Sequence, residues 1–340
     1  MTQPLLSARN IHLTYSTTTG LIRKKNVATT KAVDGVSFDI YPGETVGLVG
    51  GSGSGKSTLA RIITRLIEPD SGEVWFDGEL ITEISPDRMR LYRRDIQVVF
   101  QDPLHSLNPR RTIGESIARP LLNFSTPKKV ALAKARELME VVGLNPDSVS
   151  RYPHEFSGGQ CQRIAIARAL ALEPRLLILD EPVSALDVSV QAQILNLLKE
   201  LQKRFGIAFL FVSHDLGIVR YMCDRTLVMY RGQIMESGMS DDIHDLPGHP
   251  FTRNFIDTIL TMDGGARWLE VASRIEDVEG TQMTTEGCVF QAACTHAMPQ
   301  CRVTTPELRS VDDSRSVACH LYNEETGFSP SDLNSKYQGE

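Results

Sequence analysis

The chain has 340 residues, a formal net charge of −6 and 41% hydrophobic residues. This length suits one large domain with a smaller appendage, or two domains, and the apolar content argues against global disorder. The negative charge gives no support for nucleic-acid binding, which usually needs a basic patch. No apolar run approaches the length of a membrane span and no signal peptide is evident, so we expect a cytosolic chain that reaches a membrane only through a partner.

Strand-like and helix-like segments alternate along the first 100 residues. A glycine-rich loop joins a buried-strand candidate to the helix that follows it, and Pro69 and Gly72 end that helix. The expected strands lie at residues 11–15, 33–40, 45–49, 73–76 and 96–100, with a polar loop at 17–30 and a helix at 56–67.

The middle of the chain changes character. Residues 112–142 have a helical pattern, strongly amphipathic from 128 onward, which predicts a helical insert. Strands alternating with helices then resume and predict a mostly parallel sheet that is covered on both faces. The later helices are expected at residues 163–172, 189–205 and 215–221, and the later strands at 176–179, 208–212 and 225–230.

A complete phosphate-binding loop lies between a predicted strand and a predicted helix, in the segment Gly50-Gly51-Ser52-Gly53-Ser54-Gly55-Lys56-Ser57. This context excludes a simple glycine–serine linker. Loop amides wrap the phosphates, Lys56 reaches the β- and γ-phosphates, and Ser57 gives a hydroxyl to Mg²⁺. The predicted ATP-binding residues here are Gly50, Ser52, Gly53, Gly55, Lys56, Ser57 and Thr58.

Two acids end the apolar strand at residues 176–179. Asp180 suits a Mg²⁺ role beside the phosphate loop, and Glu181 is placed to polarise a water for attack on the γ-phosphate. Three further residues carry weaker signals. Gln101 could touch Mg²⁺ or the lytic water, His214 could hold the γ-phosphate, and Tyr15 could stack on adenine. Taken singly, such residues are more often ordinary loop, helix-start and core residues.

A second anion-binding element is the tetrapeptide Ser157-Gly158-Gly159-Gln160, just ahead of a helix-like run. Glycines at a helix start leave backbone N–H groups bare, and the helix end adds partial positive charge. Because the chain already has one phosphate loop, we expect this tetrapeptide to serve the ATP of a partner, so that the protein works as half of a pair.

The six cysteines fall into two groups. Cys161 and Cys223 are isolated and are expected to be small buried residues. The other four cluster near the C-terminus, where a reducing compartment favours metal over disulfides. Zinc, an iron–sulfur cluster and free thiols all stay open, because the spacing matches neither the common ferredoxin patterns nor the close pairs of zinc sites. These four are Cys288, Cys294, Cys301 and Cys319.

Taken in order, these motifs resemble those of ATP-binding-cassette (ABC) ATPases over about residues 5–260. The resemblance rests on the phosphate loop, Gln101, the tetrapeptide at 157–160, and the segments 176–181, 184–187 and 213–215. It implies an α/β P-loop ABC nucleotide-binding domain at 1–262, with a mostly parallel core sheet, an N-terminal antiparallel β part and a helical subdomain at about 103–172. A small irregular C-terminal cysteine-cluster region at 263–340 would follow.

The resemblance also gives roles to single residues. Gln101 corresponds to the Q-loop glutamine, and His214 to the switch histidine. Glu181 becomes the catalytic base, Asp187 the D-loop acid that couples the dimer, and Tyr15 the adenine-stacking aromatic. Ser57, Gln101 and Asp180 would contact Mg²⁺.

Several segments resemble the peptide-importer branch, namely residues 100–103, 106–110, 152–156, 181–189 and 249–252. They are similar to the ATPase subunits of dipeptide and oligopeptide importers, whose relatives also move nickel and other small solutes. One departure is Cys161, at a position that is usually basic in this branch.

The branch implies an ATP-hydrolysing subunit at the cytoplasmic face of the membrane, with ATP and Mg²⁺ as cofactors. Its expected partners are a paralogous ATPase subunit, giving a heterodimer, two transmembrane permeases and an extracytoplasmic solute-binding protein. The four-cysteine element implies a [4Fe-4S] cluster, with zinc as the alternative. The solute stays open, as does a homodimer. A soluble cassette ATPase and a non-catalytic nucleotide-gated module are the competing functions.

Overall fold

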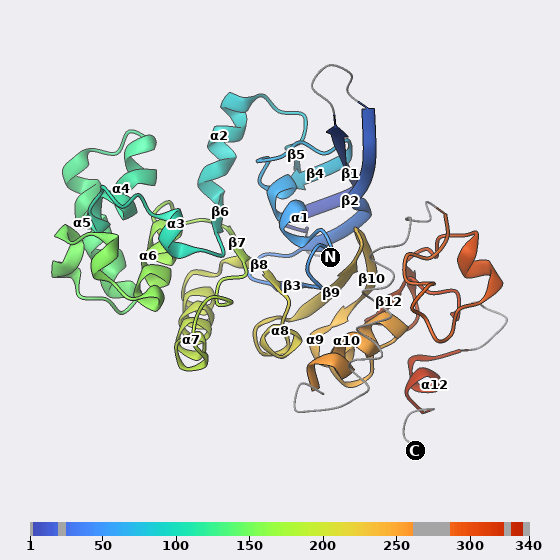
Figure 1. Ribbon diagram of the computed structural model, residues 1–340. Helices are drawn as coiled ribbons and strands as arrows, with labels where there is room; N and C mark the ends of the chain where they lie inside the picture. The colour runs from blue at the N-terminus through green and yellow to red at the C-terminus, as the bar shows by residue number, and fades with distance from the viewer. Residues whose placement is uncertain (1–2, 20–24, 261–285, 323–327, 336–340) are drawn as a thin grey trace.

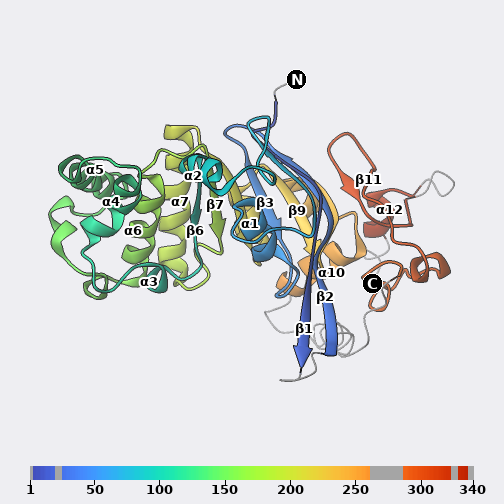
Figure 2. The same cartoon turned by 90° about the horizontal axis from the view of Figure 1, so that it is seen from above.

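The computed structural model describes residues 3–19, 25–260, 286–322 and 328–335, and two sheets form its centre (Figures 1 and 2). The strands are β1 (Leu6–Thr19), β2 (Lys25–Ile40), β3 (Thr45–Val49), β4 (Ser71–Phe76), β5 (Glu79–Leu80), β6 (Ile96–Val99), β7 (Leu176–Asp180), β8 (Ala208–Ser213), β9 (Arg225–Tyr230), β10 (Gln233–Met239), β11 (Arg309–Ser310) and β12 (Ser316–Val317). The small sheet has the order β2-β1-β4-β5, and the large one β11-β12-β10-β9-β3-β8-β7-β6.

Helices surround these sheets. They are α1 (Lys56–Ile63), α2 (Pro86–Asp95), α3 (Pro103–Ser106), α4 (Ile113–Asn123), α5 (Lys128–Val141), α6 (Gly158–Leu170), α7 (Val188–Phe205), α8 (Leu216–Met222), α9 (Ser240–Asp245), α10 (Pro250–Leu260) and α12 (Pro330–Ser335), with short 3₁₀ turns η1 (Pro146–Ser150), η2 (Pro153–Glu155) and η3 (Pro299–Arg302). None of the helices in the described part of the chain has the length and apolarity to span a bilayer.

The centre of the large sheet is parallel and buried on both faces. Strand β3 pairs in parallel with β8 and β9, and β7 pairs in parallel with β6 and β8. In β7, Leu177 and Leu179 pack in one core with α6 and α7, whereas Leu176 and Ile178 pack in another with α1 and the small sheet. Since successive strand residues point to opposite faces, this confirms the predicted doubly covered parallel sheet.

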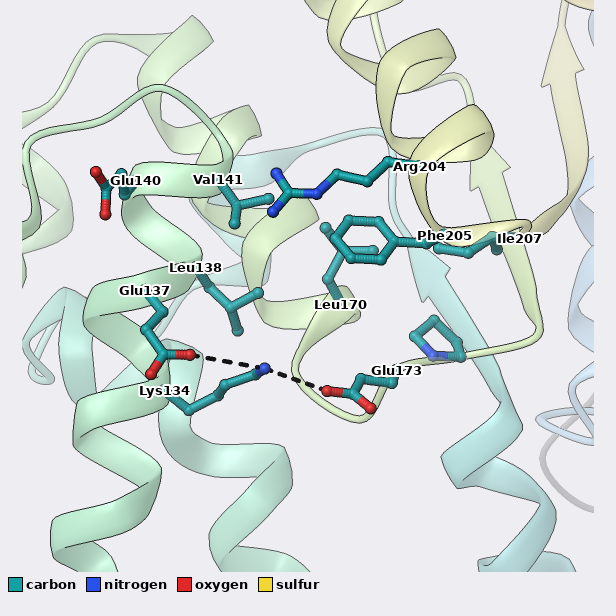
Figure 3. Close-up of a pocket in the computed structure, with 11 residues that line it drawn as sticks. Lys134, Glu137, Leu138, Glu140, Val141, Leu170, Glu173, Arg204, Phe205 and Ile207 are labelled. Atoms are coloured by element: carbon teal, nitrogen blue, oxygen red, sulfur yellow. Dashed lines mark hydrogen bonds and ion pairs between the residues drawn. The ribbon is translucent and has the colours of Figure 1, made fainter.

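The helical insert lies at one end of the large sheet and the C-terminal region at the other (Figures 1 and 2). A hollow of about 700 Å³ separates α5 from the end of α7 (Figure 3). There the Nζ of Lys134 on α5 lies 3.2 Å from the carboxylate of Glu173, in the turn after α6. Both side chains are partly exposed, so this bridge contributes at most about 1 kcal/mol. The bridge therefore adds little to the apolar packing of α5, whose Ala131, Ala135, Leu138 and Met139 belong to the same buried core as α6.

The predicted polar loop at 17–30 is wrong at both ends. Strand β1 runs to Thr19 and β2 begins at Lys25, and the antiparallel register pairs Thr17 with Ala28. Threonine is β-branched and suits strands, and a pair of strands with polar faces shows no alternation of apolar residues. The hydrophobic pattern of the sequence therefore does not reveal this end of the β1–β2 pair.

Other differences lie late in the chain. Strand β10 and helices α9 and α10 follow β9, where no element was predicted. The C-terminal region was expected to be irregular, yet β12 joins the large sheet by antiparallel pairing of Val317 with Glu236. The predicted boundary near residue 262 lies outside the described residues.

A buried acid holds this C-terminal junction together. The Glu236 carboxylate accepts hydrogen bonds from the amides of Gly248 (2.7 Å) and His249 (2.9 Å), and Arg315 lies 3.9 Å away. His249 is itself buried, and its Nδ1 accepts a hydrogen bond from the Phe251 amide at 2.9 Å. Burial lowers the pKa of His249 from its ordinary 6.5 to about 3, so the ring is neutral.

We predict that His249→Asn flattens the acid limb of the stability curve. A histidine whose folded-state pKa is depressed contributes stability that is present above pH 6.5 and is lost as the pH falls toward 3. Between pH 6 and 4 the free energy of unfolding of the unmodified chain should therefore fall more steeply than that of the variant, by up to about 1.4 kcal/mol per pH unit. Denaturant titrations at several pH values measure both slopes.

The matched control is His154→Asn, because His154 is exposed. This control should keep the slope of the unmodified chain. Equal slopes for His249→Asn and the unmodified chain would contradict the assignment.

Candidate active site

The predicted nucleotide-binding residues gather at one edge of the large sheet. The phosphate loop follows β3, Gln101 follows β6, Glu181 follows β7 and His214 follows β8. The carboxyl ends of neighbouring parallel strands meet at one edge, which is where open α/β sheets bind ligands. A pocket of about 690 Å³ lies there, within the usual range for ligand sites. It is lined by Tyr15, Thr30, Ala32, Ser52, Gly53, Ser54, Gly55, Lys56, Ser57, Thr58, Gln101, Glu181 and His214.

Close backbone contacts shape the phosphate loop. A Cβ on Gly55, whose φ is +106°, would lie 2.0 Å from the carbonyl oxygen of Ala32 on β2. A Cβ on Gly50 would lie 2.1 Å from the carbonyl oxygen of Met229 on β9. Neither position accommodates a side chain, so the loop lies directly against two strands. Its amides and the start of α1 then face the pocket, as in other helix-terminal phosphate sites.

Lys56 is held inside this loop. Its Nζ donates hydrogen bonds to the carbonyl oxygens of Gly50 (2.7 Å) and Gly51 (2.8 Å). Burial lowers the pKa of Lys56, and the nearby charges of Glu181 and Asp180 oppose that shift. The ammonium group therefore lies at the mouth of an anion-binding loop, with two carboxylates as its nearest counter-charges.

Ser57 and Asp180 form an oxygen-rich pair beside Lys56. The Ser57 hydroxyl donates to Oδ1 of Asp180 at 2.9 Å. Burial raises the pKa of Asp180, and the hydrogen bond from Ser57 opposes the rise. A hydroxyl and a carboxylate are ligands that suit Mg²⁺, which takes its remaining ligands from water and substrate phosphates. These residues therefore fit a nucleotide-bound magnesium ion.

Glu181 contacts two of the three residues that carried weaker sequence signals. Gln101 Nε2 donates to Glu181 Oε2 at 2.9 Å, and His214 Nδ1 lies 3.3 Å from Glu181 Oε1. Each carboxylate oxygen thus has its own partner. Three residues separated by at least 30 positions in the sequence form one network at the pocket.

The end of the pocket at Tyr15 includes residues that the sequence analysis missed. Tyr15 is 44% exposed on β1 and pairs in register with Thr30 on β2. Thr30 and Ala32 both line the pocket. Thr30 was missed because its stretch was predicted as a loop, and Ala32 lies just before the strand predicted at 33–40. The run of β-branched threonines was the available signal for a longer strand.

The tetrapeptide at 157–160 begins α6, and it is not among the described residues that line the pocket. Its ends form a capping box, with the Gln160 amide donating to Ser157 Oγ (3.3 Å) and the Ser157 amide donating to Gln160 Oε1 (3.0 Å). A Cβ on Gly159 would lie 2.4 Å from Val190 on α7, whose amide donates to Asp187. The tetrapeptide at the start of α6 and Asp187 at the start of α7 therefore lie next to each other.

Cys161 follows the tetrapeptide and is fully buried. Its thiol lies 3.6 Å from the carbonyl oxygen of Pro153. The side chain at position 161 thus faces the interior. Having cysteine there in place of a basic residue therefore removes no charge from the exposed end of α6.

The four C-terminal cysteines influence one another electrostatically. Burial raises the pKa of Cys294 to about 11 and that of Cys319 to about 12. Cys288 and Cys301 add to the rise at Cys294, and the three other cysteines add to the rise at Cys319. Backbone amides donate to the sulfurs: His296 to Cys294, Leu321 to Cys319 and Met298 to Cys301. Across the described ranges, however, no three His, Cys, Asp or Glu side chains stand close enough to hold a metal ion. The predicted metal site is thus not assembled in this structure.

Comparison with known proteins covers nearly the whole chain. The family model for the ABC transporter matches residues 33–184, and that for the oligopeptide/dipeptide transporter C-terminal region matches residues 235–301. A Brucella ovis protein described as a peptide import ATP-binding protein is 48% identical over 317 residues, which are 93% of this chain and 97% of the relative. The oligopeptide transport ATP-binding protein OppF of Escherichia coli K12 is 47% identical over 86% of this chain and 88% of its own length.

Solved structures agree with these sequence matches. A dimeric ATP-binding cassette in a post-hydrolysis state, bound to ADP and Pi, has a TM-score of 0.61 and 32% identity, covering 69% of this chain and 98% of the cassette. The cbiO1 protein of Clostridium perfringens, part of an ABC transporter complex, also has a TM-score of 0.61, with 27% identity over 80% of this chain and 99% of that protein.

Proposed function

The chain belongs to the ABC transporter ATPase family, and on that basis we propose that it hydrolyses ATP to power uptake of dipeptides, oligopeptides or a related small solute. The observation that carries this conclusion is a pocket lined by Lys56, Ser57, Glu181 and the two residues that contact Glu181, with Asp180 bonded to Ser57 beside it. The similarity to peptide import proteins extends through the C-terminal region, which supports peptides as the solute class.

The polar residues at the phosphate loop divide the work of hydrolysis. The loop amides and Lys56 bind the β- and γ-phosphates, and Ser57 and Asp180 would hold Mg²⁺. When bound, Mg²⁺ neutralises charge on the phosphate oxygens. A water oxygen forms a bond to the γ-phosphorus while the bond to the β–γ bridging oxygen breaks, and Glu181 accepts the proton of that water.

Gln101 and His214 are suited to sense the γ-phosphate. Gln101 donates to Glu181 at 2.9 Å, and Nδ1 of His214 lies 3.3 Å from the same carboxylate. The γ-phosphate of ATP would compete for these two side chains and so free the carboxylate of Glu181 for the water. Binding of the correct ligand would thereby complete the catalytic arrangement.

The tetrapeptide at 157–160 acts on the ATP of a second subunit. Its separation from this chain's own pocket and its exposed helix start support that role. ATP then favours the closed dimer, because it contacts both subunits only in that state. We favour a paralogous ATPase subunit as the partner, in line with the family resemblance.

We predict that Glu181→Gln traps an ATP-bound dimer. Loss of the base should reduce turnover by about 10²–10⁴-fold, while the phosphate loop still binds ATP. Light scattering should then show a dimer that persists in ATP and dissociates when ATP is removed. Glu200→Gln, on the exposed face of α7, is the control and should turn over normally. Normal turnover by Glu181→Gln would refute the assignment of the base.

A basic groove near the Q-loop suits a permease contact at the cytoplasmic face of the membrane. This groove of about 530 Å³ lies between α2, β6 and α4, and it is lined by Arg90, Arg93, Gln97, Arg119, Pro120, Asn123, Phe124, Arg168 and Leu172. The described residues that line it include four arginines and no acid. Gln97 is on the strand that leads to Gln101, and Arg168 donates to the Ser106 carbonyl at 2.6 Å. Movement in the groove can therefore reach the pocket. An extracytoplasmic binding protein would deliver the solute to the permeases.

We predict that the double variant Arg93→Glu, Arg119→Glu uncouples transport from hydrolysis. Reversing two charges should repel an acidic permease segment and lower ATP-driven uptake at least tenfold in the assembled transporter. The ATPase rate of the separate subunit should not change. Arg204→Glu, in the hollow of Figure 3, is the matched control. Full uptake by the double variant would exclude this groove as the permease contact.

For the C-terminal region we propose a [4Fe-4S] cluster held by four cysteines, with zinc as the alternative. The proximity of these thiols and the amide donors to their sulfurs support it, since such hydrogen bonds stabilise thiolate ligands. The four side chains would have to move closer together for ligation. The ligands would be Cys288, Cys294, Cys301 and Cys319.

Metal analysis after anaerobic purification tests this proposal. We predict about four iron and four sulfide per chain, lost in Cys294→Ser and Cys319→Ser. Cys223→Ala, at an isolated cysteine in the main core, should retain both. Stoichiometric zinc without sulfide would establish the alternative, and the absence of metal and sulfide would refute a metal centre.

A further inference from the structure

Glu181 has an unusual backbone conformation. Its φ is +49°, in the left-handed region that residues other than glycine adopt at a cost in free energy. Such strain persists where surrounding contacts fix the backbone, and it is common at active sites. The contacts that fix Glu181 can be identified.

Both backbone groups of Glu181 are bonded. Its N–H donates to the carbonyl oxygen of Val212 on β8 at 3.0 Å. Its carbonyl oxygen accepts from the Ser184 hydroxyl at 3.1 Å and from the Ser184 amide at 3.4 Å. Rotation about φ moves the carbonyl carbon and Cβ together about the N–Cα bond. Holding the N–H on one side and the carbonyl on the other therefore also fixes the direction of the side chain.

The turn that carries Ser184 is itself anchored. Gln191 on α7 donates through Nε2 to the carbonyl oxygens of Val183 (3.1 Å) and Leu186 (3.0 Å). Ser184 and Gln191 also line a cavity of about 60 Å³ together with Glu181 and His214. The serine thus lies against the backbone of Glu181, on a turn that α7 holds in place.

We propose that Ser184 is a positioning residue for Glu181, a role that rests on Glu181 being the base. The Ser184 hydroxyl keeps Glu181 in the left-handed conformation and so keeps the carboxylate between Gln101 and His214. Without this hydrogen bond, Glu181 relaxes toward negative φ, and its Cβ turns away from both partners. Catalysis then weakens although the phosphate loop still binds ATP.

The test measures ATP hydrolysis by the full-length chain carrying Ser184→Ala. We expect kcat to fall about five- to tenfold with KM changed less than twofold, and Ser184→Thr, which keeps the hydroxyl, to recover most of the rate. In a Glu181→Gln background, Ser184→Ala should cause no further loss of residual single-turnover hydrolysis, because the group it positions is gone. The matched control is Ser116→Ala, whose buried hydroxyl donates to the Thr112 carbonyl in α4 at 2.9 Å.

Gln191→Ala gives a second variant should Ser184→Ala fold poorly, and it should show the same selective loss of kcat. An unchanged kcat in Ser184→Ala, or an equal loss in the Glu181→Gln background, would overturn the positioning role. If Glu181 were not the catalytic base of the proposed function, Glu181→Gln would itself retain full turnover, which separates that failure from failure of the Ser184 role. An inactive Glu181→Gln with a fully active Ser184→Ala would remove the positioning role alone.

Discussion

The nucleotide site depends on the parallel pairing of β3, β8 and β7. In register, Val49 lies beside Ser213, and Asp180 lies beside Val212. Each strand therefore ends at the same level, and the residues that follow emerge together at one edge of the sheet. Antiparallel pairing of any of these strands would send its terminal residues to the opposite edge. The chemistry of the pocket is thus a consequence of strand direction.

Each charged group at this edge of the sheet has polar partners from the protein itself. Lys56 binds loop carbonyls, Asp180 accepts from Ser57, and Glu181 has a partner on each oxygen. Partly buried charges without partners would be costly, and mutual pairing also limits their motion. The pocket is consequently organised by the protein's own contacts.

The two ends of the molecule are joined to the sheet in different ways. The helical insert meets the core on one side across a hollow bridged by Lys134 and Glu173 (Figure 3). The C-terminal region adds β12 to the sheet, and its Arg315 lies 3.9 Å from the buried carboxylate of Glu236. Exposed ion pairs contribute little. The insert is held instead by apolar side chains of α4 and α5, which share one buried core with β7 and α6.

The sequence by itself determined the phosphate loop, the acids at the end of β7 and the glycine-containing start of α6, because each depends on residue types at fixed short spacing. Only the tertiary structure decided that β1 and β2 continue through the polar stretch, that Thr30 reaches the pocket, that β12 joins the large sheet and that Ser184 holds the backbone of Glu181. Strand partners and the φ of a single residue depend on distant neighbours such as Val212 on β8. Local patterns of polarity contain no information about such contacts.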